Sequence, residues 1–437
     1  MSRNFILSVD GLSPTEIGNL IRLLPKSRPL LELGLFAKLD SGVLTSATAI
    51  WAEILTGKPW HHNGCAGYSA PNDSLNNLKV IDEDDLSVPT SWLLRGAERA
   101  LDVLINIPLA RPNKATRIWL ADGSLPTNLR VVPRALLEVD PFKDYEPRSS
   151  ADFATAFSAP SKNISASIAS EMNRIDCAMQ LHKTAAWSQF IWRITLFDQL
   201  AHLAGLDILS SPDLSLFDEL RILIDHLDIA LYEMLSEPGI NWIIMSAFSH
   251  VPCRGKANIN TILNDGHFLR WLPATMALNA GARQEAVSAI TKAPLAKHAH
   301  VSMETCIDLK STVGASPVAG CIWINRAKRF KDGIVSDADY ETVFAGVREY
   351  LWTVLSQRFA SVKIEENPRR TAKQQNLSPD FIIWVEGVEF HNLPDDGSQS
   401  SHLPRTTHHP SGFVLTNHAN LKSEYKMTPT QVAGLIN

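Results

Sequence analysis

The sequence predicts an α/β sandwich with a mostly parallel central sheet flanked by helices. Short apolar runs of strand length alternate with segments whose apolar residues recur at helical spacing. Two of these runs, 5–9 and 190–197, end directly before an acid, Asp10 and Asp198. In parallel sheets, ligands gather beyond the carboxyl ends of the strands. We therefore expect a site at that edge of the sheet.

The remaining elements follow from local patterns. Ser13 and Glu16 are spaced as the start of a helix, and Gly57 and Pro59 are ordinary stop signals for a helix at about 48–55. Further strands are expected at 101–107, 118–120, 241–248, 319–325 and 381–385, further helices at 214–235 and 338–358, and a polar, site-facing loop at 394–411. We expect one domain, residues 1–437, with lid-like insertions or a cap at about 60–165 and 255–300.

Composition narrows the class of protein. The net charge is 41 − 46 = −5, so no basic surplus suggests a nucleic-acid partner. Five cysteines without a CxxC pair argue against a disulfide framework or a cysteine zinc site. The short apolar start is unlike a signal peptide, and no run reaches the roughly 18 apolar residues of a membrane helix. We expect a cytoplasmic protein with a small-molecule substrate and no membrane partner. Assembly into a homo-oligomer is compatible with the sequence.

Asp198 and His202 form the pair that best suggests metal chemistry. At helical spacing i and i+4 they face the same way, about 6 Å apart, and carboxylate oxygen with imidazole nitrogen suits zinc or a similar divalent ion. Asp10 and His408 are further candidate ligands, although an Asp-Gly pair is most often a turn and a His-rich loop is often only solvated. The window 45–49 offers three hydroxyls ahead of a helix, which serve as caps or as a nucleophile.

Taken in order, these pieces resemble the alkaline phosphatase superfamily, in particular its type I phosphodiesterase and nucleotide pyrophosphatase branch. The segments that carry the resemblance read FILSVDGL, TSATAIWAEILTGKPWHHNG, ITLFDQLAH, SPVAGCIWINRAKRFKDGIV and THHPSG. They cover nearly the whole chain and occur in the family's order, so the resemblance implies an alkaline-phosphatase-like sandwich.

The resemblance implies a set of site residues. It assigns Asp198, His202 and His408 to one metal, and Asp10 with a hydroxyl nucleophile to a second. We place the nucleophile at Thr48, with Ser46 open as the alternative, because the ungapped match puts Ala47 at that position.

The chain departs from the family pattern after the strand at 241–248. Where the family has Ser-Asp-His-Gly, this sequence reads Ser-Ala-Phe-Ser at 246–249. Ala247 and Phe248 cannot bind a metal, and His250 substitutes only if the loop is rebuilt. Losing two of four ligands should weaken the second metal severely.

The function expected from these features is a metal-dependent enzyme acting on a phosphate-like ester, with one intact site and one ion per chain, zinc being the expected metal. Phosphodiesterase-like hydrolysis or group transfer is the first hypothesis. A family member recruited to non-hydrolytic chemistry, and a non-catalytic binding protein of the same fold, are the alternatives.

Overall fold

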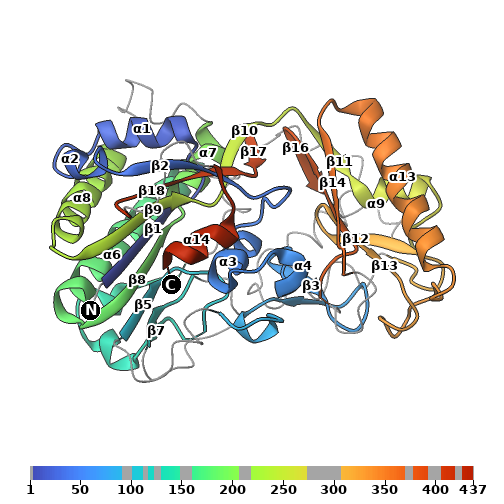
Figure 1. The fold of residues 1–437 in the computed structure, drawn as a ribbon, viewed down its shortest axis with the longest axis horizontal. Coiled ribbons are helices and arrows are strands. Elements are labelled where there is room, and N and C mark those ends of the chain that lie inside the picture. Colours follow the sequence, from blue (N-terminus) through green and yellow to red (C-terminus); the bar gives the residue numbers. More distant parts are fainter. Residues whose placement is uncertain are drawn as a thin grey trace.

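The computed structural model describes residues 3–90, 101–111, 117–122, 129–147, 160–205, 218–272, 307–369, 377–391, 405–418 and 426–436. Figure 1 shows two lobes: a larger one built on a wide twisted sheet, and a smaller one to its right. Both chain termini lie on the larger lobe.

Nine strands form the central sheet of the larger lobe, in the order β19-β2-β18-β9-β1-β8-β5-β6-β7. The five from β9 to β6 run parallel, whereas β18 and β7 run antiparallel to their neighbours. The bounds are β1 Arg3–Val9, β2 Leu35–Asp40, β5 Leu101–Ile105, β6 Arg117–Leu120, β7 Val131–Val132, β8 Trp187–Ile194, β9 Ile240–Ser246, β18 Ser411–Thr416 and β19 Lys426–Met427. The expected mostly parallel α/β sheet is confirmed.

Helices cover both faces of this sheet, and each face has its own apolar core. One core joins the sheet to α1, α6, α7 and α8, and the other joins it to α3 and α14. Their bounds are α1 Pro14–Arg22, α3 Ala47–Thr56, α6 Pro160–Thr184, α7 Leu196–Ala204, α8 Asp218–Leu235 and α14 Pro429–Ile436. Within the described ranges, no helix is both long and apolar enough to cross a membrane.

The smaller lobe is an excursion between two short strands, β10 and β17, that pair with each other. Among the described residues, this lobe contains a four-stranded sheet in the order β12-β13-β15-β14, the paired strands β11 and β16, and the helices α9 and α13. Its apolar residues belong to the same core as α3, so the lobes pack against each other. The bounds are β10 Ser249–Pro252, β11 Gly255–Asn258, α9 Ile259–Asp265, β12 Gly314–Val318, β13 Cys321–Ile324, α13 Tyr340–Arg358, β14 Val362–Glu366, β15 Phe381–Val385, β16 Val388–His391 and β17 Thr406–His409.

Local sequence signals were accurate where they depend on neighbouring residues. Ser13 caps α1 in a reciprocal capping box with Glu16, and the strand expected at 381–385 is β15. Of the two regions expected as insertions, 60–165 is in part built into the central sheet, and 255–300 is described only in part. The stretch 60–165 contains three strands of the central sheet, β5, β6 and β7. Much of 255–300, from 273 onward, lies outside the described residues.

Two expected boundaries were wrong. The strand expected at 190–197 ends at Ile194, and α7 begins at Leu196, so Asp198 belongs to a helix. The polar loop expected to contain His408 is the strand β17, because its backbone pairs with β10. Residues 394–404 of that expected loop lie outside the described part of the chain.

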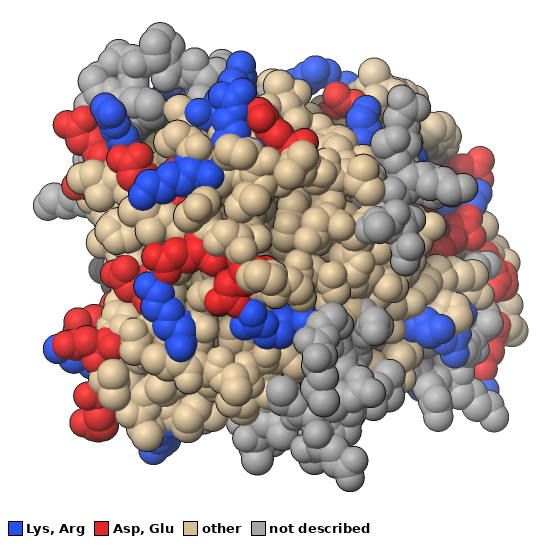
Figure 2. Space-filling view, turned by 60° about the vertical axis from the view of Figure 1, so that its left-hand side comes forward, with Lys and Arg blue, Asp and Glu red and all other residues tan. Residues whose placement is uncertain are grey.

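Charged side chains are dispersed on the face drawn in Figure 2. Lys and Arg alternate there with Asp and Glu around an uncharged central area. The described residues of this face therefore form no continuous basic patch of the kind that binds a phosphate backbone.

The contact between β18 and β9 leaves no space for a side chain at Gly412. A Cβ atom there would lie 1.9 Å from the carbonyl oxygen of Ser246. We expect Gly412→Ala to lower the free energy of unfolding by about 1–3 kcal/mol or more, since the strands would have to separate. Urea denaturation followed by circular dichroism measures this.

Gly434→Ala in α14 is the matched control, because a Cβ at that position meets no atom within 4 Å. A helical Gly-to-Ala change in open space should leave stability equal or raise it by up to about 1 kcal/mol. Equal unfolding midpoints for both variants would contradict the close approach of β18 and β9.

Candidate metal centre

Helix α7 carries two of the site residues. A single residue, Thr195, separates it from β8 at the carboxyl edge of the sheet, so Asp198 lies in its first turn and His202 one turn later. His202 Nε2 lies 3.6 Å from Asp198 Oδ1. The loop after β1 packs directly on this turn: Gly11 has φ +92, and a Cβ there would lie 2.6 Å from the Asp198 Cα. A glycine is needed both for that backbone conformation and for the close approach.

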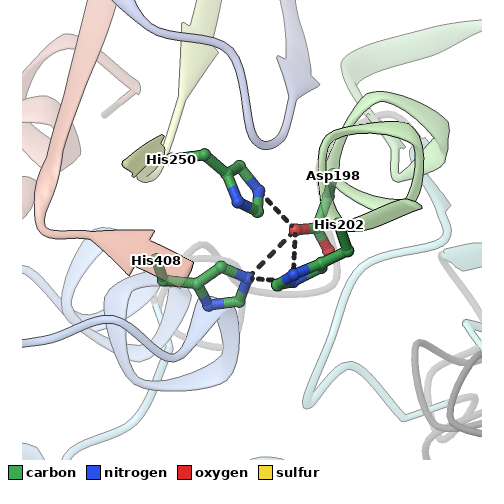
Figure 3. Close-up of side chains that lie close together, drawn as sticks. All are labelled: Asp198, His202, His250 and His408. Atoms are coloured by element: carbon green, nitrogen blue, oxygen red, sulfur yellow. Dashed lines mark hydrogen bonds and ion pairs between the residues drawn. The ribbon is translucent and has the colours of Figure 1, made fainter. Parts of the chain in front are cut away.

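The paired strands β10 and β17 supply two more histidines. His250 and His408 lie opposite each other in this antiparallel pair, which places both side chains on one face. Their Nε2 atoms reach the same oxygen, Asp198 Oδ1, at 2.9 and 3.0 Å. Figure 3 shows the three imidazoles converging on this carboxylate from three different elements.

The four side chains form a compact donor set. One ligand atom from each lies within 4.8 Å of the others. In the part of the chain that the structure describes, no other group of three or more His, Cys, Asp or Glu is arranged this way. Imidazole nitrogen and carboxylate oxygen atoms grouped this closely are typical ligands of zinc and similar divalent ions in proteins. The predicted convergence of Asp198, His202 and His408 is present in the structure.

The hydrogen bonds behind the rings determine which nitrogen faces the centre. His202 Nδ1 lies 3.1 Å from the carbonyl oxygen of Thr406, and His408 Nδ1 lies 3.0 Å from that of Thr45. Because a carbonyl oxygen only accepts, each Nδ1 must carry the hydrogen, and the Nε2 of a neutral ring then presents a lone pair. The two Nε2 atoms are 3.0 Å apart. Two lone pairs at that distance repel unless a cation lies between them, which is the arrangement of metal-binding histidines.

The electrostatics favour the metal-binding protonation states of Asp198, His202 and His250 but oppose that of His408. Burial lowers the pKa of His250 to about 4 and also lowers the pKa of His202, so both rings are neutral near neutral pH. Burial raises the pKa of Asp198, but the surrounding imidazoles outweigh it and hold the pKa well below its ordinary value. Burial opposes a charge on His408, yet Asp198 raises its pKa overall, so a proton competes with a metal at this ring.

Asp10, the ligand expected for a second metal, has other partners. Its carboxylate, fully buried at the end of β1, accepts hydrogen bonds from Ser8 Oγ and from Arg193 Nε, the latter at 2.5 Å. The guanidinium is itself only 8% exposed and neutralises this buried charge. Asp10 is therefore held by a protein cation and is not one of the four converging residues.

The hydroxyl window lies at the start of α3. Ser46 is the N-cap residue, but its side chain makes no capping hydrogen bond. Thr45 and Ser46 line a pocket of about 330 Å³ together with His202 and His408. Thr48, the favoured nucleophile in the sequence analysis, is in the first turn of α3 and is not among the residues lining this pocket. Of the two positions left open, the pocket geometry favours Ser46.

Phe248 and His250 lie where the sequence departs from the family pattern, directly after β9. Phe248 is buried, and its ring packs on His408 with the centroids 4.3 Å apart. His250, two residues further on, enters the cluster around Asp198. Sequence reasoning considered His250 only as a replacement ligand for the second metal. Its membership of the first cluster could be found only from the pairing of β10 with β17.

Comparisons with solved structures identify the fold. Phosphonoacetate hydrolase from Sinorhizobium meliloti 1021, in complex with phosphonoformate, matches with a TM-score of 0.60 and 10% identity over 100% of this chain and 95% of that chain. Murine ectonucleotide pyrophosphatase/phosphodiesterase 5, as an inactive variant with AMP, matches with a TM-score of 0.52 and 11% identity over 100% and 94%. The human protein of that name gives a TM-score of 0.51 and 12% identity over the same shares.

At these identities the likeness establishes the fold, which is alkaline-phosphatase-like, as the sequence predicted. No family model matches the sequence. No curated protein matches it either.

The two buried aspartates provide a matched test of the metal site. We expect Asp198→Asn to abolish binding of zinc by the purified protein, because the substitution removes the carboxylate at the centre of the cluster. Asp10→Asn should retain about one zinc per chain, since Asp10 pairs with Arg193. It should instead lower the free energy of unfolding by about 3–5 kcal/mol, as expected when one partner of a buried ion pair is removed.

Elemental analysis after equilibrium dialysis gives the metal content, and urea denaturation gives the stability. Loss of zinc in Asp10→Asn, or retention in Asp198→Asn, would contradict the assignment. A second zinc in the unmodified protein would show that Asp10 is a ligand after all.

Proposed function

We propose that this protein is a metal-dependent enzyme that acts on a phosphate-like ester, by hydrolysis or group transfer, with one divalent ion per chain and zinc as the expected metal. The observation that carries the proposal is the pair of imidazole lone pairs, His202 and His408, facing each other beside Asp198 on the wall of a pocket. A bound divalent ion there would supply positive charge that polarises an ester and lowers the pKa of a nearby hydroxyl.

We assign three ligands and one orienting histidine. His202 and His408 have their Nδ1 atoms on carbonyl oxygens, which leaves Nε2 free to bind a metal. His250 differs, because its Nδ1 lies 2.9 Å from a hydroxyl, Thr406 Oγ1. If that hydroxyl donates, Nε2 of His250 carries the hydrogen and donates it to Asp198 Oδ1. His250 then orients the carboxylate, and a three-ligand site keeps the open position that catalysis needs.

Ser46 and the start of α3 complete the reacting surface. The first N–H groups of a helix have no intrahelical partner and attract an anion. Ser46 stands at this end of the helix, with its hydroxyl not used in capping, on the same pocket wall as His202 and His408. An ester phosphoryl group bound there would lie between a helix N-terminus and the metal ligands.

The group-transfer step follows from this placement. Ser46 Oγ forms a bond to phosphorus while the bond from phosphorus to the ester oxygen breaks, and the hydroxyl proton ends on the released alcohol. Water then cleaves the serine ester in a hydrolase, or a second alcohol takes the group in a transferase. Arg193 and Asp10 neutralise each other, so the proposed chemistry proceeds with one metal ion.

The ligand assignment is tested by His250→Gln against His202→Gln. The His250 variant should keep one zinc per chain, with affinity reduced about 10–100-fold as for other residues that orient metal ligands. The His202 variant should lose the metal, because a direct ligand is removed. Competition with a chelating zinc indicator measures both affinities.

Loss of zinc from both variants to the same extent would make His250 a fourth ligand. The site would then be closed, which is the arrangement of a structural zinc, and the proposed catalysis would lose its main support.

The function is tested with a panel of aryl phosphate monoesters, phosphodiesters and sulfate esters offered to the zinc-loaded protein. We expect turnover of at least one phosphate ester. Ser46→Ala should reduce kcat by at least about 100-fold with zinc content unchanged, because the group that forms the covalent bond is removed. Thr48→Ala, in the first turn of the same helix and not among the residues lining the pocket, is the matched control and should retain activity.

Equal losses in the two variants would place the nucleophile elsewhere. Tight zinc binding with no turnover on any ester of the panel would favour the non-hydrolytic or binding-protein alternatives.

A further inference from the structure

We infer that the pocket beside the metal centre selects esters whose non-reacting group is uncharged and apolar, an aryl or branched alkyl group, and disfavours those that carry a second anion. This inference names the substrate class for the proposed function and rests on it.

The pocket lies where the two lobes meet. The larger lobe contributes the segment before α3 and residues 66–68. The smaller lobe contributes the turn between β12 and β13 and parts of β15 and β16. His202 and His408 line the same space of about 330 Å³, so a group attached to a phosphoryl centre at these residues would extend into it. That volume suits the apolar portion of a small organic molecule.

The walls of this pocket are mainly apolar. The apolar side chains on them are Val43, Leu44, Ala66, Tyr68, Val318, Ala319, Cys321, Ile382, Ile383, Trp384, Val388 and Phe390. Each square ångström of apolar surface that a ligand buries against them contributes about 25 cal/mol. An aryl or branched alkyl group would therefore gain affinity here in proportion to its size.

The charges on the walls disfavour a second anion. Among the described residues that line the pocket there is no Lys or Arg, and Glu389 carries the one carboxylate. Lys256 Nζ and His391 Nε2 lie 4.0 and 3.4 Å from Glu389 Oε2, so this carboxylate already has positive groups beside it. A second phosphate or carboxylate on the ligand would meet apolar walls and a like charge, and the described residues lining the pocket offer it no Lys or Arg.

Trp384 is a rigid part of the pocket wall. It is 5% exposed, with Lys363 Nζ 5.0 Å from its ring centroid and the His409 ring edge-on at 5.2 Å. Its indole N–H donates to the carbonyl oxygen of His408 at 3.5 Å, which connects this wall to the metal centre. A ring held in this way costs little entropy to order when a ligand packs on it.

Binding of phosphonates, which cannot be cleaved as esters, tests the inference apart from turnover. The probes are methylphosphonate, 1-naphthylmethylphosphonate, butylphosphonate and 3-phosphonopropanoate, titrated calorimetrically into the zinc-loaded protein. We expect the naphthyl compound to bind at least about tenfold more tightly than methylphosphonate. Butylphosphonate should bind more tightly than 3-phosphonopropanoate, whose tail has a carboxylate.

Two variants locate the selectivity in this pocket. Ala319 is exposed at the pocket wall, so Ala319→Trp should fill the space without disturbing the core. This variant should lose the naphthyl advantage and bind methylphosphonate as the unmodified protein does. Trp352→Ala, an exposed aromatic on α13 that is not among the lining residues, is the control and should change neither affinity.

The failures are distinguishable. If methylphosphonate binds and the naphthyl compound shows no advantage, or if 3-phosphonopropanoate binds more tightly than butylphosphonate, the pocket inference is overturned and the proposed function stands. An advantage that survives in Ala319→Trp also overturns it. If zinc is bound and none of the phosphonates binds, the proposed function fails, and the inference fails with it.

Discussion

The repulsion between two imidazole lone pairs is the constraint on which the site depends. His202 and His408 each donate through Nδ1 to a backbone carbonyl, and this turns their Nε2 atoms toward each other at 3.0 Å. Removing either carbonyl would let a ring change tautomer and relieve the conflict. The backbone instead holds both rings in place, so the arrangement is stable only with a cation, either a proton or a metal ion, at the centre.

The rest of the larger lobe brings those carbonyls and rings together. The segment just before α3 supplies the carbonyl of Thr45, and β17 supplies that of Thr406. Strand β17 reaches this position because the chain leaves the central sheet after β9, forms β10, builds the smaller lobe, and returns to pair with β10. The smaller lobe is therefore needed to close the site, and the same excursion forms one wall of the pocket.

Arg193 takes the place that a second metal ion was expected to occupy beside Asp10. A buried aspartate at the end of a strand needs a positive partner, which can be a metal ion or a side chain. Here the partner of Asp10 is a guanidinium from the next strand in the sheet, while the buried Phe248 packs its ring on His408. Likeness to solved phosphonate and nucleotide enzymes establishes the fold, and the reaction has to be argued from these residues, since one fold supports many chemistries.

The sequence by itself determined the fold class, the order of most elements, and the Asp198–His202 pair, because these depend on periodicity and spacing within one segment. Its resemblance to a known family also indicated His408 as a ligand of the same metal, and a hydroxyl at Thr48 or Ser46 beside Asp10 at a second metal. Only the tertiary structure decided that His250 joins Asp198, that Asp10 pairs with Arg193, and that Ser46 lines the pocket while Thr48 does not. Each of these depends on contacts between residues far apart in the chain, where strand pairing and helix packing set the distance and local sequence carries no information about it.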